Sequence, residues 1–386
     1  MLTVAALRSA DASYYFYAPE LSLPGDRWIG QGCEAAGVVG GPAPPTREAV
    51  EEILSGSAKQ WERALPGARP DRRRNLGYDA VFSTPKSVSL AAALGSEPVV
   101  QAIRRSHDAS VAAAFAYLEE QASPVVRGNG RNRVYLRSSG FAGAAFAHAT
   151  SRSLDPHLHT HVVFANFGLG EDGKWSAFNS SHLWASARTA GFLYEAHLRH
   201  RLTSVLGVGW QPVARGTAEM AGFSPEVLDE FSTRSRQVRS RLREDGRDPA
   251  TVSHREDQWA GLATRPDKPA HTDMARLAEQ WCHRGARLGL TQASIDDLLG
   301  RHRADDPDAR AAWLVGARLA RSPALARSDR TLRREALRAA CEAIPPGADP
   351  RSIPDIATAA LGSTLVRDSR ARATGCHLDA DMSISR

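Results

Sequence analysis

The alternation of apolar and polar residues predicts a series of β-strands in the first half of the chain. Leu2 to Leu7 (LTVAAL) form a short apolar run that fits a buried strand. A second strand is predicted over Tyr78 to Ser83, and Thr84-Pro85 ends it because proline breaks the hydrogen-bonded ladder. The same pattern recurs in three further segments, residues 133–137, 140–149 and 159–167. The loop through Asp155-Pro156 joins the last two into a hairpin.

Helical spacing of apolar residues predicts long helices among these strands. The strongest pattern covers residues 98–122, where Val99, Ile103, Val111, Phe115 and Leu118 share one face. Three further helical stretches are predicted, one starting at Thr46, one over residues 181–206 and an arginine-rich one over residues 231–247. Strands mixed with helices in this way predict an α+β domain.

The composition changes after about residue 300. Residues 301–340 hold ten arginines against five acidic residues, with many alanines and almost no aromatic residues. The final stretch, residues 345–386, shows little periodicity. We therefore expect two domains, an α+β domain over residues 1–300 and a basic helical appendage over residues 301–386.

Composition and charge narrow the class of protein. The 386 residues are 42% hydrophobic and 24% charged, which excludes a wholly disordered chain, and the net charge of +6 favours an anionic partner. The four cysteines are scattered without CxxC spacing, so we expect no disulfide framework and a reducing, cytoplasmic location. No apolar run is long enough for a membrane span, and the N-terminus does not resemble a signal peptide.

Three histidines are the main candidates for a functional site. His159 and His161 lie two apart on a predicted strand, so their side chains share a face, and His148 ends the preceding strand. The alternatives are polar residues on a solvated face, or core histidines bonded to the backbone. Burying three imidazoles without a metal would leave several polar groups without partners, which favours a divalent metal site. His157 is predicted to stay in the loop.

Three of the seven tyrosines, Tyr14, Tyr15 and Tyr17, fall within four positions near the N-terminus. For any one of these tyrosines, packing in the protein interior is as good an explanation as a role in catalysis. A tyrosine hydroxyl is also a nucleophile for phosphodiester transfer, because the phosphotyrosyl link conserves the energy of the bond that is broken. A metal ion nearby would hold the scissile phosphate and offset the charge that develops on its oxygens.

Asp79 and the segment after it complete the candidate site. Aspartate is disfavoured inside a strand, so we interpret Asp79 as a group that orients a metal-bound histidine or accepts the tyrosine proton. A turn or cap role is the alternative. Lys86, Ser87 and Ser89 suit contacts with phosphates, although Ser87 is equally suited to capping the following helix.

Several motifs together resemble the relaxase domain of the MobF class, the TrwC/TraI-like branch of the HUH endonucleases. That name describes two metal-binding histidines that flank one residue, here Thr160. The motifs follow in order over about residues 1–300: Ser13-Tyr14-Tyr15, residues 79–89 (DAVFSTPKSVS), residues 148–152 (HATSR), residues 155–161 (DPHLHTH) and residues 230–235 (EFSTRS).

The resemblance implies a central antiparallel sheet with packed helices, gripping single-stranded DNA between a palm and helical fingers. It implies strand-specific transesterification at an origin of transfer during conjugation, with a 5′-phosphotyrosyl intermediate. Tyr14 would be the nucleophile, with Tyr15 beside it, and Asp79 would be the acid/base or the histidine-orienting group. The metal, Mg²⁺, Mn²⁺ or Zn²⁺, would be held by His148, His159 and His161. Phosphate contacts are expected from arginines of the finger-like helix, Arg234, Arg236, Arg239, Arg241 and Arg243, with a solvated helix face as the alternative.

The chain departs from the family pattern in two ways. A second tyrosine pair is missing, so Tyr15, Tyr17 or a second protomer is left to perform a second strand transfer, unless termination proceeds in another way. The GxxxxGK[ST] phosphate loop of the family's helicase is also missing, so no use of ATP is expected. Residues 301–386 resemble the basic linker that precedes that helicase. The partners that the resemblance implies are relaxosome proteins, a type IV coupling protein and a separate helicase.

Two other functions remain open at this point. A degenerate relaxase would bind single-stranded origin DNA without cutting it. A zinc hydrolase would use the histidine pair on a small substrate, but would need neither the tyrosine pair nor a basic helix.

Overall fold

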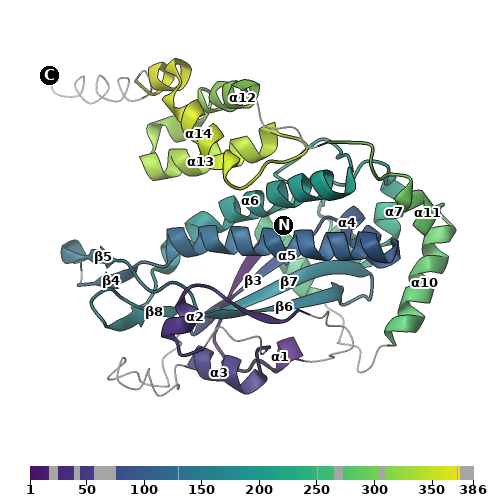
Figure 1. Ribbon diagram of the computed structural model, residues 1–386, viewed down its shortest axis with the longest axis horizontal. Coiled ribbons are helices and arrows are strands. Elements are labelled where there is room, and N and C mark those ends of the chain that lie inside the picture. The colour runs from purple at the N-terminus through teal and green to yellow at the C-terminus, as the bar shows by residue number, and fades with distance from the viewer. Residues whose placement is uncertain are drawn as a thin grey trace.

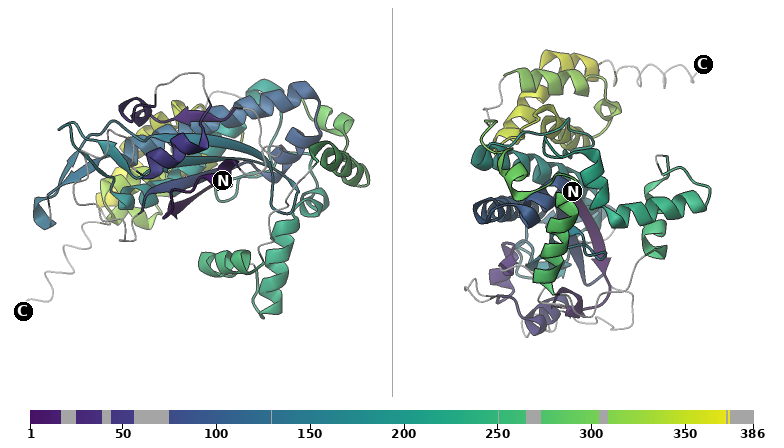
Figure 2. Two further views of the ribbon diagram at one scale, coloured as in Figure 1. Left: turned by 90° about the horizontal axis from the view of Figure 1, so that it is seen from below. Right: turned by 90° about the vertical axis from the view of Figure 1, so that its right-hand side faces the viewer.

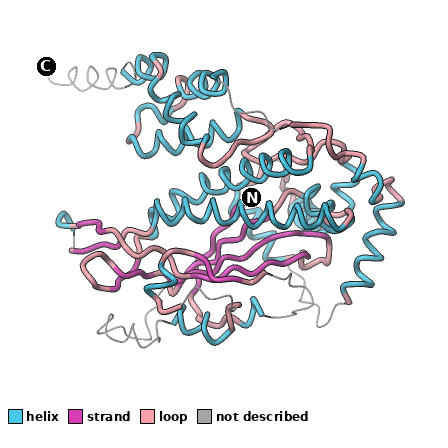
Figure 3. Tube along the Cα trace, viewed as in Figure 1, coloured by secondary structure: helices cyan, strands magenta, loops and turns pink. Residues whose placement is uncertain are grey.

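The computed structural model describes residues 1–16, 25–38, 44–55, 75–128, 130–249, 251–264, 273–303, 309–371 and 373. Within these residues, a five-stranded sheet in the order β1-β3-β7-β6-β2 forms the centre of the molecule (Figures 1 and 3). Every neighbouring pair in this sheet is antiparallel. The strands of the sheet are β1 (Leu2–Leu7), β2 (Arg27–Ile29), β3 (Gly77–Ser83), β6 (Gly143–Thr150) and β7 (Pro156–Ala165).

Four short strands form two small antiparallel sheets at one end of the central sheet. The pairs are β4 (Val125–Arg127) with β5 (Val134–Leu136), and β8 (Phe167–Leu169) with β9 (Trp175–Ala177).

The helices surround the central sheet on both faces and at its other end. In chain order they are α1 (Ser13–Phe16), α2 (Gly32–Ala35), α3 (Arg47–Ser55), α4 (Lys86–Leu94), α5 (Glu97–Ala122), α6 (Ser180–Leu206), α7 (Pro225–Glu230), α8 (Thr233–Glu244), α9 (His254–Ala263), α10 (Met274–Ala286), α11 (Gln292–Asp296), α12 (Ala309–Leu319), α13 (Asp329–Ala343) and α14 (Ser352–Gly362). None of the helices described is long and apolar enough to cross a membrane.

Different helices pack on the two faces of the central sheet. One face carries the even-numbered residues of β7, such as Val162 and Phe164, which pack in the main core with Phe115 of α5 and Leu198 of α6. Helices α5 and α6 lie side by side over this face (Figure 1). The other face carries the odd-numbered residues, and Val163 packs there in a smaller cluster under α1 and α3. The period of two along β7 therefore decides which side chains reach the α1 face.

Helices α12 to α14 pack behind α6, on the side away from the sheet (Figure 1). Arg199 of α6 is fully buried there and donates to three backbone carbonyls, at 3.0 Å to Pro345, 3.2 Å to Gly216 and 2.7 Å to Cys341. Gly347 has a φ of +79°, and a Cβ atom there would lie 2.0 Å from the carbonyl oxygen of Ala196. The C-terminal helices are thus packed tightly on α6 instead of trailing from it.

Helices α8 and α9 project from the body, where the green-teal part of the chain extends away from the sheet (Figure 2). Helix α8 is strongly basic and buries only Leu242. The two helices pack mainly on each other.

The structure confirms the α+β class and the central antiparallel sheet. The predicted strand over residues 2–7 and the helices over residues 98–122, 181–206 and 231–247 are present within a few residues of the expected bounds. Helix α14 lies in the final stretch, where the sequence showed little periodicity. The helical pattern is weak there because the helix is short and packs through alanines and isoleucines in the C-terminal cluster. The division into domains at residue 300 stays a prediction.

A buried histidine behind the sheet gives a prediction about acid stability. His107 of α5 bridges the hydroxyls of Tyr194 and Thr160, at 2.8 Å each, and burial lowers its pKa to about 3. Its pKa in the unfolded chain is about 6.5, so below that pH the unfolded state binds a proton that the folded state excludes. Folding stability is therefore lost as the pH falls from about 6.5 towards 3, by up to about 1.4 kcal/mol per pH unit for this one group.

Replacing His107 by glutamine is expected to flatten the fall of the free energy of unfolding with acidity, because the amide takes up no proton. Urea unfolding in EDTA at several pH values between about 6.5 and 4 measures the slope. The control is His283→Gln, which changes an exposed histidine of α10. Equal slopes in the wild type and in His107→Gln would show that His107 is not held neutral.

Candidate active site

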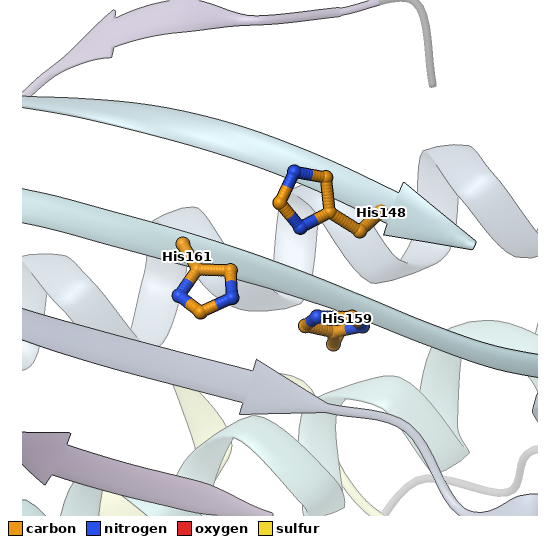
Figure 4. A group of neighbouring side chains, drawn as sticks. All are labelled: His148, His159 and His161. Carbon is orange, nitrogen blue, oxygen red and sulfur yellow. The ribbon is translucent and has the colours of Figure 1, made fainter. Parts of the chain in front are cut away.

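Three histidines lie together on the α1 face of the sheet, on the neighbouring strands β6 and β7 (Figure 4). His148 is the register partner of His159, and His161 follows two residues later on the same face. One nitrogen of each ring lies within 4.8 Å of those of the other two, and the ring centroids are 5.2 to 5.3 Å apart. His159 and His161 are only 9% and 6% exposed, which excludes a solvated sheet face.

Partners on two of the rings determine which nitrogen faces the centre of the cluster. The Nδ1 of His159 donates to the carbonyl oxygen of His157 at 2.9 Å. The Nδ1 of His161 donates to both oxygens of Asp79, at 3.0 and 2.9 Å. Both rings therefore offer Nε2 as the lone-pair donor, which is the neutral form that binds a metal.

Burial and the neighbouring histidines, His157 first, hold the pKa of His159 well below its usual range. The ring therefore stays neutral at ordinary pH, which suits a metal ligand. Three imidazole nitrogens with a carboxylate behind one of them match the donor set of divalent transition-metal sites that leave positions open for substrate. The residues present thus fit a divalent metal.

Asp79 lies on β3, directly across from Val163 of β7, and so projects onto the same face as His161. Its carboxylate also accepts a hydrogen bond from the hydroxyl of Tyr15, at 3.1 Å. Tyr15 is only 5% exposed, stacks on Phe146 and meets the ring of His161 edge-on at 5.4 Å. Asp79 therefore joins the metal-site histidine to the tyrosine-bearing helix α1.

Tyr14 lies in α1, one residue before Tyr15. The structure describes its place in the helix but not its side chain, and Tyr17 lies outside the described residues.

His157 corrects one prediction from the sequence. It was expected in the loop, but it lies within β7, whose ladder extends back to the pair Thr150 and Pro156. Its ring packs on His159 with centroids 4.7 Å apart, and burial lowers its pKa to about 3. It does not belong to the group of three converging nitrogens. The period of two shared by His157, His159 and His161 is the sequence signal that could have placed it on this face.

Ser87 is a second correction, because it is wholly buried and therefore cannot contact a phosphate. Its hydroxyl donates to Glu219 at 2.6 Å and accepts from the amide of Met220 at 2.8 Å. Glu219 also accepts from the backbone amides of Lys86 and Ser87, so this distant carboxylate caps α4 and Ser87 does not. The predicted cap role for Ser87 is therefore wrong as well.

Lys86 is half-buried and donates through Nζ to the carbonyl oxygen of Pro156 at 2.7 Å. Burial lowers the pKa of this ammonium to about 8, while Asp155 and Glu219 oppose the shift. Its head group therefore holds the start of β7, and contact with DNA stays a prediction.

Several arginines of α8 bind acidic groups or backbone carbonyls close to them. Arg234 donates to the carbonyl oxygens of Gly261, in α9, and of Thr264, which directly follows it, and so ties the two projecting helices together. Arg236 and Arg239 both pair with Asp229. Each of these two side chains is still 37% exposed, which leaves guanidinium surface for a further anion.

The fold and the geometry of this site place the chain in the relaxase class. The chain belongs to the TrwC relaxase family, whose model matches residues 4–288. The family that the motifs resembled is thereby confirmed.

Similar proteins include the multifunctional conjugation protein TraI of Escherichia coli, 31% identical over 294 residues. The match covers 72% of this chain and 16% of TraI. TraI of E. coli strain K12 is 29% identical over 296 residues, again covering 16% of the relative. The chain thus spans about a sixth of the length of these relatives.

Solved structures of the conjugative relaxase TrwC in complex with oriT DNA have the same fold. The metal-free structure is 28% identical with a TM-score of 0.66, and the metal-bound structure is 28% identical with a TM-score of 0.68. Each match covers 76% of this chain and 100% of the TrwC chain.

Proposed function

We propose that this chain nicks one DNA strand at an origin of transfer during conjugation, and that Tyr14 becomes joined to the 5′ phosphate. The observation that supports this most is the convergence of His148, His159 and His161, with Asp79 linking His161 to the tyrosine-bearing helix α1. TrwC, whose structures include complexes with oriT DNA and a metal-bound form, has the same fold.

The proposed reaction is a transesterification. The phenolic oxygen of Tyr14 attacks the scissile phosphorus and gives up its proton to solvent. The bond to the 3′ oxygen breaks, and the 3′ end takes one proton from solvent and leaves as a hydroxyl. The phosphodiester energy is kept in the phosphotyrosyl bond, so the strand can be rejoined in the reverse direction. A divalent ion, Mg²⁺, Mn²⁺ or Zn²⁺, held by the three histidines would supply positive charge beside the non-bridging phosphate oxygens.

In this proposal Asp79 acts on His161. Its two oxygens accept from Nδ1 of that ring, which fixes the tautomer and turns Nε2 towards the metal position. The bond from Tyr15 holds the carboxylate in place, so Tyr15 acts as a support in our proposal and Tyr14 as the nucleophile.

Single-stranded DNA is the proposed substrate. Arg234, Arg236 and Arg239 lie on the projecting helix α8, and the exposed surface of the last two suits contacts with phosphates. We further propose that residues 1–300 carry the nickase and that residues 301–386 form a helical unit. In this proposal the chain needs no ATP. It acts in the bacterial cytoplasm with relaxosome proteins, a coupling protein and a separate helicase.

A denaturing gel tests the proposal. The protein is incubated with Mn²⁺ and 3′-end-labelled single-stranded segments from the DNA that flanks its own gene. We expect a labelled protein band that survives denaturation, because the link is covalent. EDTA should remove this band, and added Mn²⁺ should restore it.

Two outcomes would contradict this function. Tight binding of the same DNA without any covalent band would indicate a relaxase that binds without cutting. A band that persists in EDTA would show that the reaction does not require a metal ion bound by the three histidines.

A further inference from the structure

The turn between β6 and β7 carries a strained backbone. Leu154 has a φ of +57°, a left-handed conformation that is unfavourable for a residue with a Cβ atom. The turn is closed by Ser151, whose amide donates to the carbonyl oxygen of Asp155 at 2.9 Å and whose hydroxyl accepts from the amide of Asp155 at 3.2 Å. The ladder is irregular between His148 and Thr150, just before this turn. The turn is therefore not a regular hairpin connection that would position His148 by itself.

Contacts from distant helices hold this turn in place. The indole Nε1 of Trp281, on α10, donates to the carbonyl oxygen of Leu154 at 2.8 Å. Lys86, on α4, holds the carbonyl oxygen of Pro156. These helices lie with α7 at the same end of the sheet (Figure 1). Leu154 and the start of β7 are thus held by groups outside the hairpin.

Asp155 makes the strongest of these links, through both carboxylate oxygens. It is 1% exposed. One oxygen accepts from the amide of Thr233 at 2.8 Å, and the other pairs with Arg284 at 3.1 Å. Thr233 is the first residue of α8, and Ser232 before it makes no side-chain cap. Asp155 therefore satisfies an unpaired amide at the start of the basic helix.

Arg284 extends this link to the end of α7. Its guanidinium donates to the side chain of Glu230 at 3.2 Å and to the backbone oxygen of Glu230 at 2.7 Å, and lies 4.4 Å from the centre of the Phe231 ring. The junction between α7 and α8 is therefore clamped to the turn by one buried carboxylate and one arginine.

We propose that Asp155 is a positioning residue of the metal centre. By tying the β6–β7 turn to the start of α8 and to α10, it holds His148 opposite His159 at the spacing that a shared metal requires. The proposal rests on the proposed function, since it takes the three histidines to be the metal ligands. Asp155 itself touches neither the metal position nor DNA in this scheme.

Asp155→Asn tests the proposal with little change in side-chain size. The asparagine side chain has one oxygen and one NH₂ group, so its oxygen can accept from only one of Thr233 and Arg284. Its NH₂ group then faces the other donor, and that hydrogen bond is lost. Mn²⁺ binding to the full chain without DNA is measured by electron paramagnetic resonance of the free ion, well below the unfolding temperature. We expect about tenfold weaker binding, as for other groups that orient metal ligands.

Asp172→Asn is the matched control. It also breaks an aspartate–arginine pair, with Arg127, but lies in the turn between β8 and β9. Strand β8 lies at the opposite end of the molecule from α4 and α10 (Figure 1). We expect its Mn²⁺ affinity to equal that of the wild type. Arg284→Gln should weaken Mn²⁺ binding too. In the double variant the loss of Mn²⁺ binding free energy should be smaller than the sum of the two single losses, because both substitutions act on the same link.

The outcomes separate this inference from the proposed function. If Asp155→Asn lowers the unfolding temperature but folded protein binds Mn²⁺ as the wild type does, Asp155 is merely structural and the inference is overturned. If the wild type itself binds no Mn²⁺, the metal centre of the proposed function fails and the inference fails with it.

Discussion

Tyr14→Phe is expected to abolish the covalent protein–DNA band while leaving the binding of single-stranded DNA nearly unchanged. The substitution removes only the phenolic oxygen, which is the proposed attacking atom. Loss of a nucleophile typically lowers the rate by at least about 10³-fold, whereas the groups that grip the DNA remain. Quantifying the labelled band against time, and DNA affinity by fluorescence anisotropy, measures both effects.

Tyr15→Phe is the matched control for this change. It removes an equivalent oxygen one residue later, but that oxygen is buried and donates to Asp79. Losing one hydrogen bond to a charged group costs about 1.5–3 kcal/mol, so we expect a slower reaction that still gives the covalent band. The opposite pattern, with the band lost in Tyr15→Phe and kept in Tyr14→Phe, would assign the nucleophile to Tyr15.

His159→Ala is expected to have the second-largest effect. It removes one of the three converging nitrogens and leaves a site with two imidazoles. A metal ion stabilises charge in the transition state by several kcal/mol, so losing it would lower the rate by about 10³-fold. Initial rates of covalent-band formation over a range of Mn²⁺ concentrations measure the loss, and high Mn²⁺ should restore part of the activity.

His157→Ala is the control on the same strand and the same face. Its ring packs on His159 but is not one of the converging three, and the bond from His159 is to its backbone oxygen, which alanine retains. We expect the rate to fall by less than about tenfold. If His157→Ala were as damaging as His159→Ala, His157 would have to be counted among the metal ligands.

The convergence of the histidines could be predicted because it follows from local geometry. A period of two places His159 and His161 on one face, and a short connection returns the chain beside His148. The partners of these side chains could not be predicted in the same way. Asp79 meets His161 across 82 positions of sequence, a contact that depends on which strands become neighbours.

The error at Ser87, and the burial of two residues for which the sequence made no prediction, have the same origin. Ser87 has the chemistry of a phosphate ligand, but Glu219, 132 positions away, covers it. Asp155-Pro156 has the composition of an exposed turn, yet Thr233 and Arg284 bury the carboxylate of Asp155. Arg199 resembles a surface arginine until α13 packs over it. In each case a tertiary contact decided the role of a residue whose local pattern favoured another.

The order of strands in the central sheet has a consequence for how the molecule loses activity on heating. Strands β3, β7 and β6, which carry Asp79 and the three histidines, are each hydrogen-bonded on both sides, whereas β1 has a strand partner on one side only among the residues that the structure describes. Partial opening costs least at an edge, so the segment that leads from β1 to Tyr14 should detach before the ladder beneath the metal position does. Thermal inactivation would then begin as a reversible loss of cutting, in molecules that still retain their metal.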